Sequence, residues 1–258
     1  MKSLVKKLAN TNIGILLRNS LNFKPVSLKH FEKDYPISVS DAFLWRTDNG
    51  YKTKFKYSDI LNLFYKVENS WVEFHFYSKR NELIKIDKIN KLQLSNEFEI
   101  DSKYLNNLED YGVFYIYHFS KDVTNLNQQD IISNRCYLGY SKNNNLYSFV
   151  HGNTFAKFTS ISSNKEISTN IVKTSLFKNQ KYTIQKYFKD FDLNELFFIN
   201  PTDKVIKFSI GNKNYKLNPN FALQLDISSH IISIKSNCMF LRPTIFSYKG
   251  QYMDVHHS

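Results

Sequence analysis

Residues 133–153, SNRCYLGYSKNNNLYSFVHGN, have a counterpart in residues 236–258, SNCMFLRPTIFSYKGQYMDVHHS. Both segments begin with Ser-Asn, carry a cysteine close behind, continue as an apolar run, turn through polar residues and then include Val-His near their ends. Two apolar runs divided by a polar turn are typical of a β-hairpin. The two matching segments therefore predict two copies of one β-rich unit.

The segments that precede the two hairpins also correspond, and they do so in the same order. Residues 61–65, 72–77, 94–100 and 113–117 of the first copy match residues 193–198, 205–210, 217–223 and 231–234 of the second. In each copy, turns separate short alternating apolar runs about every 8–12 residues. This spacing of turns is typical of the strands in a β-sandwich. The pattern predicts an all-β fold class, with two tandem β-sandwich-like domains that arose by internal duplication and a short N-terminal helical arm.

The expected boundaries place the N-terminal arm at residues 1–40, the first sandwich domain at 41–158 and the second at 159–258. Leu4, Leu8 and Ile15 give the arm partial helical periodicity, and Pro25 and Pro36 break the chain after it. The apolar stretch at 13–17 is too short to span a membrane, and no small-residue cleavage site follows it. We therefore expect an arm that is retained in the mature chain, and no membrane span.

The composition is that of a globular protein, with 42% hydrophobic and 16% aromatic residues. The net charge of +12 invites a nucleic-acid partner, but lysine far outnumbers arginine and the lysines are scattered. The enriched residue types Lys, Asn and Ile have AT-rich codons, so a low-GC genome explains this usage without any binding role. The charge therefore favours solvated lysine faces over nucleic-acid binding, because base reading and bidentate phosphate contacts favour arginine.

Cys136 and Cys238 stand at matching places in the two hairpin segments. Matching positions in two separate domains lie far apart, so we expect two buried free thiols in a reducing compartment, which means a cytoplasmic protein. No Cys/His spacing of the zinc-binding kind is present in the sequence.

Four short motifs resemble those of uncharacterised two-part β proteins of bacteria. They are the Phe-Val-His-Gly-Asn ending at 149–153, the Met-Asp-Val-His-His ending at 253–257, the Phe-Leu-Trp-Arg run at 43–46 and the Leu-Arg-Pro step at 241–243. The resemblance covers residues 40–258 and implies no established activity. It implies an association with surface-polysaccharide synthesis.

The C-terminal strand carries the clearest candidate for metal chemistry. Asp254 and His256 are two residues apart, so they share one face of a strand with Tyr252. An Asp-x-His pair supplies two metal ligands, or a carboxylate that orients an imidazole. His151 is the counterpart of His256 in the first copy, but no carboxylate stands two residues before it. Either His151, Asp254 and His256 form a metal site at the domain junction, or the histidines cap their strands; we expect the Asp254 face to look toward the first domain.

Arginine is rare in this chain, and Arg46, Arg135 and Arg242 lie in its most patterned segments. A guanidinium in such a place either binds a carboxylate, sulfate or phosphate group of a ligand or pairs with an Asp or Glu at the domain junction. The rings of Trp45 and Tyr252 are suited to stacking on a sugar, and core packing is the other role open to them.

The sequence contains no nucleophile-elbow motif, no phosphate-binding glycine loop and no His-Glu-x-x-His helix. We therefore predict a non-catalytic binding or accessory protein that needs no cofactor and whose ligand is a glycan or an anionic polymer. One alternative is a metal-dependent enzyme whose site at the junction uses His151, Asp254 and His256. A second alternative is a charge-driven nucleic-acid binder.

Overall fold

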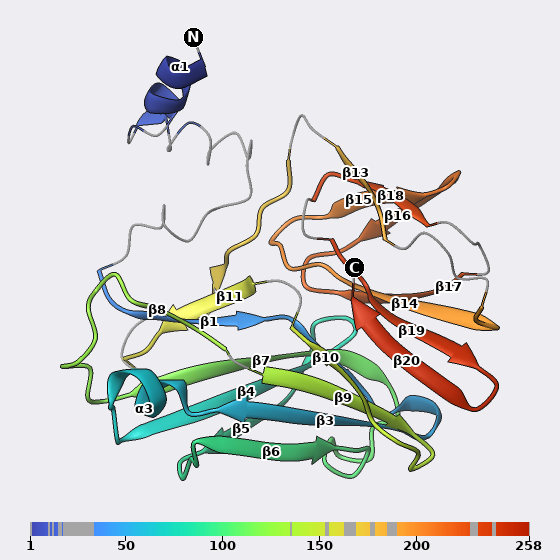
Figure 1. Ribbon diagram of the computed structural model, residues 1–258, viewed down its shortest axis with the longest axis horizontal. Coiled ribbons are helices and arrows are strands. Elements are labelled where there is room, and N and C mark those ends of the chain that lie inside the picture. Colours follow the sequence, from blue (N-terminus) through green and yellow to red (C-terminus); the bar gives the residue numbers. More distant parts are fainter. Residues whose placement is uncertain are drawn as a thin grey trace.

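A computed structural model describes residues 2–9, 11, 13–14, 17, 34–134, 136–152, 155–162, 169–175, 179–184, 190–227, 232–238 and 241–257. Strands dominate this part of the chain, and they form small sheets that stack as two sandwiches (Figure 1). The predicted all-β class is confirmed. The N-terminal helix α1 (Lys2–Ala9) is present and stands apart from the sheets.

The first sandwich consists of three four-stranded sheets. Sheet A has the order β12-β11-β1-β8, sheet B the order β2-β7-β4-β5 and sheet C the order β10-β9-β3-β6. The bounds are β1 (Ile37–Asp41), β2 (Phe43–Arg46), β3 (Tyr51–Ser58), β4 (Ser70–Ser78), β5 (Leu83–Ile89), β6 (Ser95–Ile100), β7 (Tyr111–Ser120), β8 (Ile131–Ser133), β9 (Cys136–Lys142), β10 (Ser148–His151), β11 (Phe155–Ser160) and β12 (Thr169–Asn170). Two short helical segments join them: a 3-10 turn at Asp48–Gly50 and helix α3 (Ile60–Tyr65).

The second sandwich consists of two four-stranded sheets. Sheet D has the order β13-β18-β15-β16 and sheet E the order β17-β14-β19-β20. The bounds are β13 (Gln180–Thr183), β14 (Leu193–Ile199), β15 (Ile206–Ile210), β16 (Lys213–Leu217), β17 (Ala222–Ile227), β18 (Ser233–Ser236), β19 (Thr244–Lys249) and β20 (Tyr252–His257).

The two sandwiches repeat one topology, which confirms the internal duplication. If β2–β7, β9 and β10 are replaced in chain order by β13–β20, sheet B becomes sheet D and sheet C becomes sheet E. The hairpins β4–β5 and β15–β16 correspond. The hairpins β9–β10 and β19–β20, which contain the two matching sequence segments, correspond as well. The boundary expected between residues 158 and 159 stays a prediction, and β12 beyond it still pairs with β11.

Two details of the expected correspondence are wrong. Residues 193–198 lie in β14, whose counterpart by strand order is β3, whereas residues 61–65 lie in helix α3. The Asp59 carboxylate caps this helix by accepting a hydrogen bond from the Asn62 backbone N–H at 3.1 Å, which favours a helical start over a strand. The cysteines are not equivalent either, because Cys136 pairs with Tyr57 in a ladder while Cys238 lies in the connection between β18 and β19.

Sheet A has no counterpart among the described residues of the second copy, and it covers the outer face of β7. The hydroxyl groups of Ser40 and Ser38 accept the backbone N–H groups of Ile116 and His118 at 3.0 and 2.9 Å. These bonds satisfy N–H groups at the edge of β7, and Ala156 of β11 belongs to the same buried cluster as the outward-facing side chains of β7. Strand β7 is thus buried on both faces, as the continuous apolar run at 112–119 predicts. The equivalent face of sheet D keeps its exposed lysines.

The cores of the two copies meet at a shared boundary. The main cluster of buried apolar side chains in the first sandwich also contains Phe197, Phe246 and Val255 from the second. Cys136 belongs to this cluster and Cys238 to the separate core of the second sandwich, and both thiols are buried and free.

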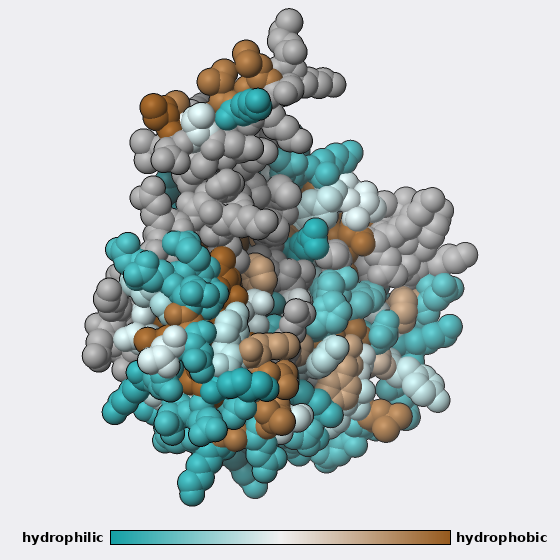
Figure 2. All heavy atoms as spheres, turned by 60° about the vertical axis from the view of Figure 1, so that its left-hand side comes forward, coloured by the Kyte–Doolittle hydropathy of each residue, from teal (hydrophilic) through white to brown (hydrophobic). Residues whose placement is uncertain are grey.

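Helix α1 leaves its apolar side chains in solvent. Leu4, Val5 and Leu8 are 65%, 61% and 61% exposed, and apolar atoms gather on this projecting end of the molecule in Figure 2. None of the helices in the described part of the chain combines the length and the hydrophobicity that crossing a membrane requires.

The buried His118 of β7 provides a test of the buried polar structure. Its Nε2 atom lies 3.0 Å from Asn134 Oδ1, and burial lowers the pKa of His118 to about 4. An unfolded chain takes up this proton near pH 6.5 and the folded chain does not, so the free energy of unfolding should fall as the pH drops from about 6.5 to 4, by about 3 kcal/mol in all. His118→Gln should remove this component from urea-unfolding curves measured across that pH range. An unchanged slope in the variant would contradict the buried neutral imidazole.

Candidate functional site

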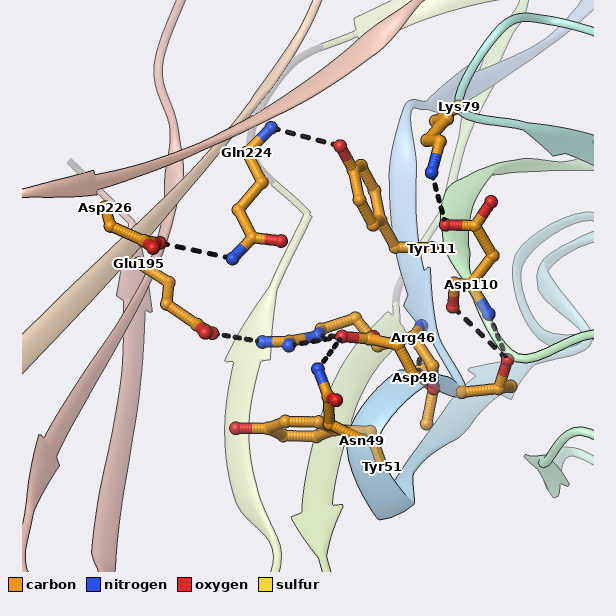
Figure 3. A network of polar contacts seen from close by, with 12 residues as sticks. Arg46, Asp48, Asn49, Tyr51, Lys79, Asp110, Tyr111, Glu195, Gln224 and Asp226 are labelled. Carbon is orange, nitrogen blue, oxygen red and sulfur yellow. Dashed lines mark hydrogen bonds and ion pairs between the residues drawn. The ribbon is translucent and has the colours of Figure 1, made fainter.

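Arg46, at the end of β2, is fully buried and joins the two sandwiches. Its guanidinium donates to both carboxylate oxygens of Asp48, at 3.0 Å from Nε and 2.8 Å from Nη2. Its Nη1 atom donates to Glu195 Oε2 in the second sandwich at 2.6 Å, so the cation bridges the junction (Figure 3). Burial alone lowers the pKa of Arg46, but the hydrogen bond and charge of Asp48 and the charge of Glu195 raise it above its ordinary value.

Aromatic rings enclose this ion-pair network. The Arg46 guanidinium carbon lies 3.8 Å from the centre of the Tyr51 ring and 4.6 Å from that of Phe197. The Tyr248 hydroxyl donates to Glu195 Oε2 at 2.6 Å and contacts the Tyr51 hydroxyl. The sequence left two roles open for Arg46, ligand binding and an intramolecular ion pair. The geometry is that of an intramolecular pair at the junction, and no face of the guanidinium is open to a ligand.

The other residues predicted to bind a ligand lie in different surroundings. Trp45 is fully buried and its Nε1–H donates to the Tyr77 carbonyl at 3.0 Å, so its ring belongs to the core and cannot stack on a sugar. Tyr252 is 83% exposed on β20, and Arg242 is exposed before β19. Arg135 lies outside the described residues. Ligand roles for Tyr252, Arg242 and Arg135 stay predictions.

The C-terminal strand turns the opposite face to the one we expected. Met253 and Val255 pack against the first sandwich, where the Val255 backbone N–H donates to Ser148 Oγ at 3.0 Å. Asp254 lies on the other face and its side chain is 60% exposed. The expectation that the Asp254 face looks toward the first domain is wrong, because burying the apolar pair is what stabilises this contact.

The two Val-His endings do meet, but through His257. The His257 Nε2 atom lies 3.2 Å from His151 Nδ1, whereas His256 lies beside Asp254, with Nδ1 and Oδ2 3.7 Å apart. Burial lowers the pKa of His256 and the charge of Asp254 partly offsets that effect. Among the residues that the structure describes, no cluster of three or more His, Cys, Asp or Glu side chains could hold a metal ion. The grouping of His151 with Asp254 and His256 that the metal-site alternative requires is thus not formed.

The candidate ligand site is a groove of about 950 Å³ along the outer face of sheet D, which we call the lysine groove. Four exposed lysines line it, together with amide, hydroxyl and ring groups. The lining includes Lys204, Lys207, Lys216, Lys235, Asn214 and Tyr215. None of the described lining residues is acidic.

The register of the strands places these cations side by side. Lys207 of β15 is directly opposite Lys216 of β16, and Ser209 lies between Asn214 and Lys235. Lys181 of β13 stands opposite Lys235 and extends the basic row across the sheet. The four strands of sheet D, over their described bounds, contain no Asp or Glu.

The first copy handles its lysines differently. In the hairpin β4–β5, which corresponds to β15–β16, Glu73 stands opposite Lys88. On sheet C, Lys52 lies 3.2 Å from Glu99, and Lys56 lies 3.3 Å from Glu97. Opposite charges across a strand pair are the ordinary arrangement of a solvated face, so the unopposed lysines of sheet D are an exception within the same protein.

Comparison with known proteins does not assign this site. No protein-family model matches the chain, and neither the curated proteins nor the solved structures provide a match.

Sequence reasoning missed the lysine groove because it treated the lysines as scattered along the whole chain. A local signal was present: between Lys204 and Met253, Asp226 is the only acidic residue. Counting charge separately for each copy would have located the basic surface. The pairing of Lys207 with Lys216 depends on the hairpin register, which follows the turn at Gly211.

Proposed function

We propose that the protein binds an anionic polysaccharide in the lysine groove and does so without catalysis. The observation that carries the proposal is the row of lysines on sheet D without a carboxylate on the same strands. Like charges directly opposite each other destabilise a sheet. A polyanion that neutralises these lysines removes their repulsion, which makes the free energy of binding more favourable. The groove is also large enough for several sugar units.

The remaining lining favours a glycan over a nucleic acid. Asn214 and the neighbouring amide and hydroxyl groups can bind sugar hydroxyls and carboxylates in many orientations. Arginine is absent from the described lining, and Tyr215 is the single aromatic residue there apart from the buried Phe208. Single-stranded nucleic acids are usually held by stacking on several exposed rings and by arginine, which this groove lacks.

The proposal keeps two predictions made from the sequence: an association with bacterial surface polysaccharide, and work in the cytoplasm. The two buried free thiols support a reducing compartment. The basic groove supports an acidic polymer rather than a neutral one.

Binding should be tested with a fluorescently labelled acidic polysaccharide, such as alginate, against uncharged dextran of the same length. We expect the acidic polymer to bind and dextran to give no signal in this groove. Four lysine contacts predict a log–log salt slope of about −3, or about a 50-fold loss of affinity between about 50 and 200 mM salt. A labelled oligothymidylate serves as the nucleic-acid probe. Equal or tighter binding of that probe would overturn the preference for a glycan, and salt-independent binding would overturn the lysine contacts.

A further inference from the structure

A second groove, of about 610 Å³, opens on the first sandwich. It shares no lining residue with the lysine groove. It forms where the ends of β3, β9 and β10 approach β1 and β11. We call it the Tyr137 groove; its lining includes Asp41, Lys56, Tyr137, His151, Gly152 and Phe155.

Exposed aromatic rings border this groove. Tyr137 is 55% exposed and Phe155 is 44% exposed, and both line the opening. The strand register sets Tyr137 between Lys56 of β3 and His151 of β10. The His151 ring lies 6.1 Å from the Tyr137 ring in an edge-on arrangement and is itself held by His257. Tyr137 therefore has a neighbour on each adjacent strand, and more than half of the residue stays exposed to solvent.

The floor of the groove includes a buried carboxyl group, that of Asp41. The Asp41 carboxyl forms no hydrogen bond with the described residues. It lies against the backbone of Gly152, where a Cβ atom would come within 1.9 Å of Asp41 Oδ2, so only glycine leaves it this room. Burial raises the pKa of Asp41 to about 7, so near neutral pH the carboxyl offers both a donor and acceptors.

The thiol of Cys136 lies in the same floor but does not supply a nucleophile. Burial and the nearby charge of Asp41 raise the pKa of this thiol, so it stays protonated. Among the described lining residues, Lys56 is the single lysine, and its ammonium lies 3.3 Å from the Glu97 carboxylate. The Tyr137 groove thus differs in kind from the lysine groove.

From this arrangement we propose that the Tyr137 groove binds an uncharged sugar residue, which stacks its apolar face on Tyr137 and hydrogen-bonds the Asp41 carboxyl through neighbouring hydroxyls. A pyranose ring has one apolar face and a rim of hydroxyls, which matches an exposed tyrosine beside a polar floor. Sites of this kind use mostly apolar and aromatic surface with a few placed polar groups. The inference concerns a site separate from the lysine groove.

Isothermal titration with three neutral trisaccharides, maltotriose, cellotriose and the trimer of N-acetylglucosamine, tests the proposal. At least one should bind the full chain. Tyr137→Ala should weaken that binding tenfold or more, Asp41→Asn should weaken it less, and Tyr137→Phe should retain it. Because Tyr137 is more than half exposed, the alanine variant should keep the melting temperature of the parent protein.

The matched control is Phe64→Ala, which removes a 60% exposed aromatic side chain that lines neither groove and should leave the affinity unchanged. A charge-reversed lysine groove, Lys207→Glu with Lys216→Glu, should also leave trisaccharide binding unchanged, so this inference and the proposed function can fail separately. Binding of none of the three sugars at millimolar concentration would overturn the proposal. So would equal losses in the Tyr137 and Phe64 variants.

Discussion

Replacing Arg46 with methionine should lower the free energy of unfolding by about 3–5 kcal/mol, because it leaves partly buried carboxylates without their cation. The side chains of Asp48 and Glu195 are only 16% and 14% exposed, so water can compensate them only in part. Methionine has the length to keep contact with the rings of Tyr51 and Phe197, which isolates the loss of charge from the loss of volume. Urea unfolding followed by tryptophan fluorescence measures the change.

A second substitution separates the ion pair from general damage. Arg46→Met with Glu195→Gln should recover part of the loss, since Glu195 no longer carries a buried unpaired charge, and the coupling between the two positions should be about 0.5–3 kcal/mol. Arg80→Met is the surface control, at an exposed turn position, and should change stability by no more than about 0.5 kcal/mol. A loss below about 1 kcal/mol in Arg46→Met would show that the bridge does not hold the junction together.

Reversing two charges in the lysine groove should have the largest effect on binding. Lys207→Glu with Lys216→Glu places two carboxylates opposite each other in the hairpin β15–β16, where a polyanion would otherwise meet two cations. We expect affinity for the acidic polysaccharide to fall by about 100-fold or more at about 50 mM salt. Labelled-alginate titration measures the loss.

The matched control changes the net charge by the same amount, but on the other copy. Lys52→Glu with Lys56→Glu alters two lysines that lie within 3.3 Å of a glutamate on sheet C, and it should reduce affinity only slightly. The single change Lys216→Glu carries a further signature: it sets opposite charges across the ladder, so stability should rise by about 0.2–1 kcal/mol while binding falls. Equal losses in both charge-reversed double variants would mean that the polymer responds to net charge and not to this groove.

The sequence was informative where a pattern is local. Alternation of apolar residues predicts strand β4, because a period of two follows from strand geometry. A continuous apolar run predicts β7 as a central strand, and the repeated hairpin predicts the duplication. Helix α3 was missed because a six-residue apolar run fits a strand or a helix, and the deciding feature is the cap at Asp59. The face of β20 that packs on the first sandwich was predicted wrongly, although Met253 and Val255 were the residues with surface to bury.

The candidate sites depend on distances that no local pattern contains. Arg46 and Glu195 are separated by most of the first copy, and their contact exists only once the two sandwiches are packed. The lysine groove needs the register of three strands, and the Tyr137 groove needs five strand ends to converge. Residue type alone therefore singled out Arg46 but could not tell its structural role from a ligand-binding one.

The extra sheet of the first copy bears on how this protein could diversify. Sheet A covers a surface whose duplicate, on sheet D, has no covering sheet among the described residues. One copy is thereby committed as scaffold, while the outward positions of the other can mutate with little effect on either core. Because the first copy is constrained on both faces of sheet B, we expect sequence variation to accumulate on the outer face of sheet D. The same face is the one to change in laboratory redesign.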